Sequence, residues 1–351
     1  MRARLGARRT PFPVPILCGT LRRMSRPRRT EADLRRSAID LLSAERSERD
    51  VHYLARVFAQ IGLPYKDPDK PSNVAGENPR EPLKGWGRSN GNLTLLIQPG
   101  VYIDPSGVSV SRGFPFGSTP RLLLAWMSTE VVRTRGPELI LGDSLSAFMR
   151  NLGLRPTGGK TGTIARLRDQ MERLFNATFV VNWNGTGVSG AVRVPVSSQY
   201  QLFWTDEGAS RRESVFPSKV ILSDTFFQEI ADHAVPLDVH ALKELRGSPL
   251  RLDMYAWLTY RMFGLGRPTT IPWESIQGQF GSGYASSPQG RSKFKKDFEK
   301  HLARVLLVYP DADVTLTPAG VVLRPSPTSV PTRLARTIGA LDDLRTGSRG
   351  W

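Results

Sequence analysis

One helix-forming stretch occurs twice in this 351-residue chain, and its recurrence decides the predicted fold. Residues 119–134 are TPRLLLAWMSTEVVRT, and residues 248–265 are SPLRLDMYAWLTYRMFGL. The offset that places Trp126 on Trp257 also places Ile140 on Ile271 without a gap. At the same offset, spacing and residue class persist in the pairs Ser144 and Ser275, Leu145 and Ile276, Leu167 and Phe298, Met171 and Leu302, Leu174 and Val305, and Phe175 and Leu306. An internal duplication therefore predicts two related domains.

Both copies predict the same order of elements. An apolar helix leads into a short strand, a second helix, a Gly/Ser-rich turn, a longer third helix and a hairpin, which is the order of a winged helix. The predicted fold class is α+β, with two tandem winged-helix domains related by internal duplication. The strands are expected at 138–141 and 269–272, and the second helices from near Ser144 to Gly153 and from Trp273 to Gly281. The hairpins are expected at 179–196, about Asn184-Gly185, and at 314–324, about Pro318-Ala319-Gly320.

The third helix of the second copy separates apolar from basic side chains. Phe294, Phe298, Leu302 and Val305 have the spacing of one buried stripe, and a series of Lys and Arg residues falls on the opposite face. Such a face is also typical of a helix that is merely solvated. Its place in the third helix of a winged helix favours contact with DNA, and the candidates are Arg291, Lys293, Lys296, Lys300 and Arg304.

The third helix of the first copy gives a weaker signal. Its apolar residues 164, 167, 171 and 174 turn inward, so Arg166, Asp169 and Arg173 are expected to face outward, with Gln170 on the flank. The preceding residues 157–162, TGGKTG, offer backbone amides and a lysine at a helix N-terminus, which suits a phosphate. Asp169 and Glu172 dilute the charge of this face. The candidate DNA-binding residues here are Lys160, Thr161, Arg166, Gln170 and Arg173, with Arg193 on the hairpin.

The net charge of +17, from 49 Lys and Arg against 32 Asp and Glu, indicates a partner that is a polyanion. Residues 1–29 hold nine arginines and no acid. They form either a basic arm that grips phosphates or an untranslated stretch before a start at Met24, whereas a proline-interrupted apolar run makes a poor signal peptide. The predicted organisation is this arm over 1–29, a first domain over 30–212, a second over 213–327 and a flexible tail over 328–351 that begins to lose apolar residues at Pro325.

Several classes of function are disfavoured. A single cysteine, Cys18, excludes an internal disulfide and a cysteine-rich zinc site, and the apolar runs are too short to span a bilayer. The segment around Lys160 lacks the glycine spacing of a nucleotide-binding loop, because Gly153 is one residue out of place. The four histidines are dispersed, and Asp311 and Asp313 fall in an expected turn. We therefore expect no enzyme, metal or cofactor, and a protein of a reducing compartment.

Three stretches resemble the plasmid-encoded RepA family of replication initiator proteins. They are residues 88–91 followed by 113–126; 141–142 through 157–159 and 170–171; and 248–261 with 271–273 and 279–281. The resemblance covers roughly residues 30 to 327 and departs from the expected pattern at Phe116 and Val131.

That resemblance implies a theta-type initiator in the bacterial cytoplasm. It would bind directly repeated sites (iterons) in double-stranded DNA at a plasmid origin, help to open the duplex, and recruit the host initiator and helicase. It also implies homodimers that do not initiate and that repress their own gene. The alternative is a winged-helix transcriptional repressor without a replication role, since both functions share every feature derived from the residues.

Overall fold

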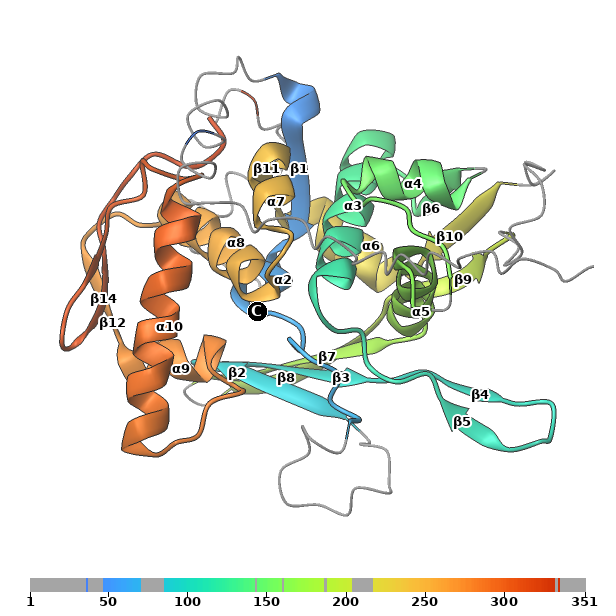
Figure 1. The fold of residues 1–351 in the computed structure, drawn as a ribbon, viewed down its shortest axis with the longest axis horizontal. Coiled ribbons are helices and arrows are strands. Elements are labelled where there is room, and N and C mark those ends of the chain that lie inside the picture. The colour runs from blue at the N-terminus through green and yellow to red at the C-terminus, as the bar shows by residue number, and fades with distance from the viewer. Residues whose placement is uncertain are drawn as a thin grey trace, which may run out of the picture.

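The structure is a computed structural model that describes residues 36, 47–70, 85–142, 144–159, 161–185, 188–203, 217–331 and 334. Both helices and several small sheets are present in these residues (Figure 1), so the mixed composition of helix and strand predicted from the sequence is confirmed. The basic stretch over residues 1–29 lies outside the described residues.

The first copy contains the predicted elements in the predicted order. Its second helix begins where expected, because the Ser144 hydroxyl accepts a hydrogen bond from the Ala147 N–H at 3.4 Å and caps the helix. Gly142 and Gly153 have positive φ angles at the two ends of this segment. The elements are α3 (Ser118–Thr134), β6 (Glu138–Gly142), α4 (Leu145–Asn151), α5 (Thr163–Phe175), β7 (Thr178–Gly185) and β8 (Val188–Pro195).

The second copy repeats this order at the predicted offset. The offset between Trp126 and Trp257 also separates the starts of the two first helices, the starts of the two first strands and the ends of the two third helices. The second copy's third helix is longer than α5, with 19 residues against 13. The elements are α8 (Pro249–Phe263), β12 (Thr269–Pro272), α9 (Trp273–Phe280), α10 (Pro288–Leu306), β13 (Val314–Leu316) and β14 (Gly320–Leu323).

Both copies bury a tryptophan of the first helix against a phenylalanine of the second. The ring centroids of Trp126 and Phe148 lie 4.8 Å apart, and those of Trp257 and Phe280 lie 5.3 Å apart, both edge to face. Edge-to-face pairs of this kind stabilise a core beyond their buried area. The duplication detected in the sequence is thus a duplication of core packing as well as of element order.

The sheets of the two copies are paired differently. In the second copy, β14 lies between β12 and β13 in one antiparallel sheet. In the first copy, the hairpin β7–β8 extends β3 (Leu93–Gln98) and β2 (Trp86–Asn90), while β6 pairs with β10 (Ser218–Leu222) and β10 pairs with β9 (Ser197–Gln201). Pro195 has no N–H for the ladder and ends β8, after which the chain turns into β9. In the first copy, therefore, β6 does not pair with the hairpin β7–β8, whereas the equivalent strand β12 of the second copy does pair with its own hairpin.

One of the two predicted hairpin turns is misplaced. Asn184 still pairs with Ser189 and Gly185 with Val188, so the reversal lies after Gly185 and not at Asn184-Gly185. The second turn is confirmed, because Thr317 and Gly320 exchange backbone hydrogen bonds across Pro318-Ala319.

The strand β10 and the helix α6 (Asp224–His233), which precede the second copy in the sequence, both pack against the first copy. The helix α6 packs against α3 and β8. The boundary predicted at residue 213 therefore falls before elements that lie on the first copy. The chain crosses to the second copy through β11 (Ala234–Asp238) and α7 (Val239–Leu245).

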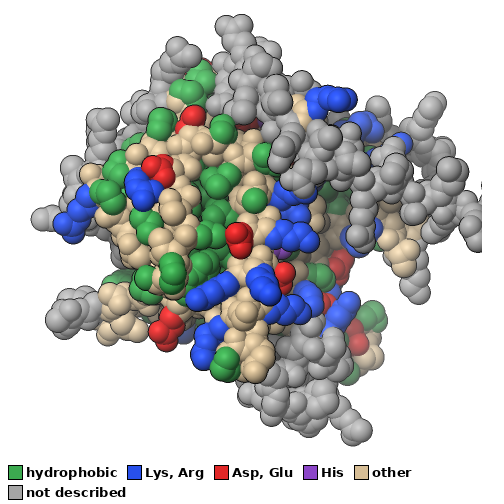
Figure 2. All heavy atoms as spheres, turned by 60° about the vertical axis from the view of Figure 1, so that its left-hand side comes forward, with side chains coloured by type: hydrophobic (Ala, Val, Ile, Leu, Met, Phe, Trp, Pro, Cys, Tyr) green, Lys and Arg blue, Asp and Glu red, His purple; other side chains and the backbone are tan. Residues whose placement is uncertain are grey.

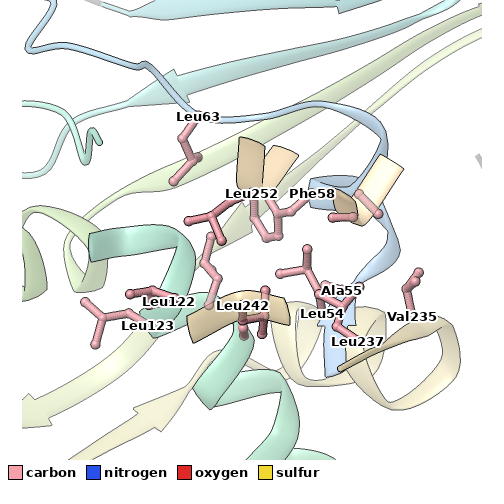
Figure 3. Packing of buried hydrophobic residues seen from close by; sticks show 14 of the residues in the cluster. Leu54, Ala55, Phe58, Leu63, Leu122, Leu123, Val235, Leu237, Leu242 and Leu252 are labelled. Carbon is pink, nitrogen blue, oxygen red and sulfur yellow. The ribbon is translucent and has the colours of Figure 1, made fainter. Parts of the chain in front are cut away.

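The two copies meet at a short central ladder. The 3₁₀ turn Glu48–Asp50 leads into β1 (Val51–Ala55), which pairs antiparallel with β11, and α2 (Arg56–Gln60) follows. In Figure 1 this ladder stands between α8 and α10 on one side and α3, α4 and α5 on the other. Figure 3 shows the core below it, where side chains from β1, α2, α3, β11, α7 and α8 converge: Leu54, Phe58, Leu122, Leu237, Leu242 and Leu252.

A buried ion pair joins the first helices of the two copies. The Arg121 guanidinium donates to both carboxylate oxygens of Asp253, at 2.6 and 2.8 Å, and the two side chains are only 7% and 6% exposed. Arg121 also donates to the carbonyls of Leu63 and Gly117. A Cβ at residue 62 would clash with the Asp253 carboxylate, so only glycine lets this carboxylate approach.

A second arginine reaches the same carboxylate from β2. Arg88 lies 3.9 Å from Asp253 and donates to the Ser282 hydroxyl at 2.7 Å. The ring of Tyr65 lies against the guanidinium groups of both Arg88 and Arg121. The carboxylate of Asp253, on the second copy, is thus the shared counter-ion of two buried arginines, Arg121 on α3 and Arg88 on β2.

The tail predicted from Pro325 onward does not begin there. Ser329 and Val330 are buried, and Ser329 is hydrogen-bonded to the Tyr255 hydroxyl at 2.7 Å. The Tyr309 hydroxyl donates to the Pro327 carbonyl at 2.7 Å. Two buried tyrosines supply hydrogen-bond partners for this segment, one to a side chain and one to the backbone, which composition alone could not indicate. Except for residue 334, the remainder after residue 331 lies outside the described residues.

We expect Asp253→Asn to lower the free energy of unfolding by about 3–5 kcal/mol, because it leaves two buried arginines without their counter-ion. The measurement is urea unfolding of the full chain. Asp313→Asn is the matched control, since Asp313 pairs with Arg324 at the surface and its loss should cost about 1 kcal/mol or less. Equal effects of the two variants would contradict the central role of this ion pair.

His52 on β1 makes the stability depend on pH. Burial, together with the charges of Arg133 and Lys243, lowers the pKa of His52 to about 4, although Asp50 opposes the shift. An unfolded histidine titrates near pH 6.5, so the folded chain binds fewer protons and loses stability as the pH falls from about 6.5 to 4. Urea unfolding at pH 7.5 and 5.0 should show a smaller loss for His52→Gln than for the unsubstituted chain. An identical pH dependence of the two proteins would refute this assignment.

Candidate nucleic-acid interface

The helix α10 is fixed to its copy by aromatic packing. Phe294, Phe298, Leu302 and Val305 are all buried, as their spacing predicts. The ring of Phe298 lies 5.7 Å from that of Trp273 and 5.9 Å from that of Phe280. These contacts determine which face of α10 is left for solvent.

The N-terminus of α10 is capped and held by its preceding loop. The Ser287 hydroxyl accepts from the Gly290 N–H at 3.1 Å, and Pro288 occupies the first turn. The Tyr284 hydroxyl donates to Asp297 at 2.8 Å, and burial and this carboxylate raise the pKa of Tyr284 to about 12. The helix start is therefore rigid without help from a ligand.

The exposed face of α10 is basic. Lys293, Lys296 and Lys300 are exposed, as is Arg291, whose guanidinium donates to the Ser286 carbonyl at 2.8 Å. Figure 2 brings the side of the molecule that carries α10 forward and shows Lys and Arg side chains gathered in a band across it. The expected separation of apolar and basic faces is present in the structure, and contact of these side chains with DNA stays a prediction.

At the C-terminal end of α10, the predicted Arg304 lies in a cluster with Arg251 and His301, two side chains that the sequence did not indicate. Arg304 is half-buried and lies near Arg251 of α8, whose guanidinium donates to the His301 Nδ1 atom at 3.1 Å. Burial and the charges of Arg251 and Lys300 lower the pKa of His301, with Asp297 acting in the other direction. Arg251 enters this cluster only because α8 packs on α10, so helical phase alone could not reveal it.

The turn before α5 is closed by two threonines. The Thr157 and Thr163 side chains each accept a hydrogen bond from the other's backbone N–H, at 2.9 and 2.8 Å. Gly162 precedes the helix with the backbone of residues 157 and 158 packed against its Cα. Thr161 and Arg166 are exposed at this end of the helix, as predicted, while Lys160 lies outside the described residues.

Two predicted base-reading residues of α5 are structural. Gln170 is only 5% exposed, and its side-chain carbonyl accepts from the Phe116 N–H at 2.8 Å. Arg173 pairs with Asp169 at 3.0 Å and Asp67 at 3.5 Å, so it does not face outward alone. The outward orientation predicted for Arg173 was wrong because the segment around Asp67 folds over the C-terminal half of α5.

Arg193 is exposed on β8. Its partner across the ladder, Val180, is buried, and the strand it belongs to is part of the four-stranded sheet described above. Its contact with DNA stays a prediction.

Among the described residues, no three His, Cys, Asp or Glu side chains come together as a metal ion would require. Every helix described is too short or too polar to cross a bilayer.

One protein-family model matches part of the chain. Residues 114–274 match RepA_C, described as the plasmid encoded RepA protein. This part of the chain is similar to the plasmid-encoded RepA family. The matched region runs from the segment before α3 to the start of α9, so it includes the six elements of the first copy and both residues of the Arg121–Asp253 pair, whereas β1, α2 and Arg88 lie before it. The resemblance inferred from the sequence motifs is confirmed.

A crystal structure of domains 2 and 3 of RctB is similar, with a TM-score of 0.43 and 12% identity, over 72% of this chain and 96% of that chain. No curated protein matches the sequence.

We expect Gln170→Ala to destabilise the fold, by about 1–3 kcal/mol, because it leaves the Phe116 N–H buried without a partner. The Gln170→Ala variant should keep the same ratio of affinities for specific and random DNA as the unsubstituted chain. Arg166→Ala is the matched variant on the exposed side of α5, and it should change stability by no more than about 0.5 kcal/mol. Urea unfolding and binding to paired specific and random duplexes measure both. An altered base preference in Gln170→Ala would restore that residue as a reader of bases.

Proposed function

We propose that this chain is a plasmid replication initiator that binds repeated sites in double-stranded DNA at its origin. The observation that carries the proposal is the match of residues 114–274 to the plasmid-encoded RepA family. The basic exposed face of α10, opposite an apolar face held in the core, supports it independently. Proteins that neutralise several phosphates with Lys and Arg gain affinity by releasing counter-ions, which suits a net charge of +17.

Each copy is proposed to act as a winged helix, with its third helix in a major groove. In the second copy, Lys293, Lys296 and Lys300 would contact phosphates or base edges along the groove. In the first copy, the contact would come from Thr161 and Arg166 at the N-terminus of α5, because Gln170 and Arg173 are engaged inside the protein. The first copy would therefore contribute more to positioning and the second copy more to affinity.

The buried junction would set the distance between the two helices. Arg121 on α3 and Asp253 on α8 join the first helices of both copies, so the two copies would bind as one rigid unit to grooves one helical turn apart. Binding to adjacent repeats would then concentrate strain in the neighbouring duplex and help to open it. Recruitment of the host initiator and helicase belongs to the same proposal.

A transcriptional repressor with the same fold is the second candidate. Its motivation is that the basic faces and the duplicated order serve any sequence-specific DNA-binding protein equally. The DNA beside the gene separates the two: direct repeats next to an A·T-rich stretch favour an initiator, and a short inverted repeat in a promoter favours a repressor. The decisive test asks whether the gene and this DNA together sustain a circle that otherwise does not replicate. Loss of the circle despite tight binding to the repeats would favour the repressor.

Substitution of two lysines of α10 tests the DNA contact. Lys296→Ala with Lys300→Ala should weaken binding to the repeats and reduce the slope of log affinity against log salt by about 0.9 for each phosphate that the variant no longer neutralises. The same variant should lose the replicating circle. Glu299→Ala is the control on the same helix, where an exposed acid is removed and affinity should hold or rise. An unchanged salt slope in the lysine variant would remove α10 from the interface.

A further inference from the structure

One face of the sheet β2–β3–β7–β8 is incompletely covered. The side of the sheet that faces α2 and α6 holds Phe179, whose ring lies 4.9 Å from that of Phe58 on α2 and 6.5 Å from that of Phe226 on α6. An eight-residue strand such as β7 is about 27 Å long, whereas the five-residue helix α2 is about 8 Å long. Short helices cannot cover such strands, and part of their apolar face is left open.

The uncovered part forms a groove of about 380 Å³. Apolar side chains from both helices and all three nearer strands make up its wall: Val57, Phe58, Leu93, Phe179, Val181, Val192, Val194 and Phe226. Its volume falls in the range of about 300–1,000 Å³ in which proteins bind ligands. The groove is therefore large enough to take several apolar side chains from another molecule.

The mouth of the groove is acidic, in contrast to the chain as a whole. Asp224, Glu229 and Asp232 of α6 all border it, and Asp224 and Asp232 are exposed. Glu229 lies 3.5 Å from His233 on the next turn of the same helix. The cation that borders the groove from α2 is Arg56, whose own exposure is only 8%. Three carboxylates around an apolar groove are unexpected on a surface whose net charge is +17.

We propose that this groove is a docking site for a cationic amphipathic segment of a partner protein. Bulky apolar side chains of that segment would enter the groove, and Lys or Arg side chains beside them would meet the carboxylates of α6. Charge complementarity is the reason for this choice of partner. The three carboxylates would repel the phosphates of DNA, so the site is separate from the basic face of α10.

A second copy of the chain fits the groove less well. Among the described residues, four of the six exposed large hydrophobic side chains lie on the ribbon β4 (Val101–Ile103) and β5 (Ser109–Ser111) and its turn, which projects from the body in Figure 1; the other two, Ile140 and Phe203, lie on or beside the β6–β10–β9 sheet. Val101 and Ile103 are 65% and 67% exposed. Residues 98–111 hold no Lys or Arg, so this ribbon would leave the acidic mouth unmatched.

The test uses two synthetic helical peptides of equal length, with identical Leu and Phe side chains on one face. One carries Lys at the polar positions, and its twin carries Glu. Fluorescence anisotropy with the full chain in the absence of DNA should show the Lys peptide binding about tenfold or more tightly, with affinity that falls as salt rises. A net charge of +17 opposes any unspecific attraction of the Lys peptide, which makes the preference diagnostic.

Two variants and a control locate the binding. Val192→Trp fills the groove, and Asp232→Lys reverses an exposed charge at its mouth without touching the core. Each should lower the affinity for the Lys peptide about tenfold and leave DNA binding unchanged. Asp311→Lys, at an exposed acid before β13, is the matched control and should bind like the unsubstituted chain.

Two outcomes would overturn the proposal. They are equal binding of the two peptides and unchanged affinity in Asp232→Lys. Dimers of the unliganded chain that Val192→Trp abolishes would assign the groove to a second copy instead. None of these outcomes bears on DNA binding or plasmid maintenance, so the docking site and the proposed function stand or fall separately.

Discussion

The pairing of Arg121 with Asp253 is the constraint on which the arrangement of the two copies depends. Both charges are out of water, so each is tolerable only while the other is in place. The geometry they require fixes α3 against α8, and it demands a glycine at residue 62 and a tyrosine ring beside both arginines. A packed apolar contact between these helices would allow some sliding. A bidentate ion pair with further bonds to backbone carbonyls does not.

In the proposed function, the junction between the two copies limits how they could bind DNA. Two copies on a flexible linker would search for two grooves independently, and each would lose orientational freedom on binding. Copies held by a buried ion pair and by the β1–β11 ladder have lost that freedom during folding. The consequence is that a rigid pair could bind only sites that have one fixed spacing. Direct repeats of fixed length are the kind of DNA that such a pair would suit.

The two copies differ in how their sheets are paired and in which side chains their third helices expose. The second copy keeps a closed three-stranded sheet and an α10 whose outer face presents exposed lysines. In the first copy, the hairpin β7–β8 pairs with β3, which in turn pairs with β2. In the C-terminal half of α5, Arg173 pairs with Asp67 and Gln170 accepts a hydrogen bond from Phe116. The strands β3, β7 and β8 of this sheet line the apolar groove beside α6 together with α2, so the pairing that distinguishes the first copy from the second also forms the wall of the proposed docking site.

The sequence by itself determined the duplication, the order of elements in each copy and the phase of α10. These are local properties: the period of apolar residues, serine caps and glycine stops act within a few residues, and Ser144, Phe294 and Phe298 behave as their spacing predicts. Only the tertiary structure decided which strands pair, that Arg121 meets Asp253, that Gln170 and Arg173 turn to internal partners and that Arg251 joins His301. Each of these is a contact between residues far apart in the chain. A pattern of spacing specifies the face on which a side chain lies, but it carries no information about what the rest of the chain brings to that face.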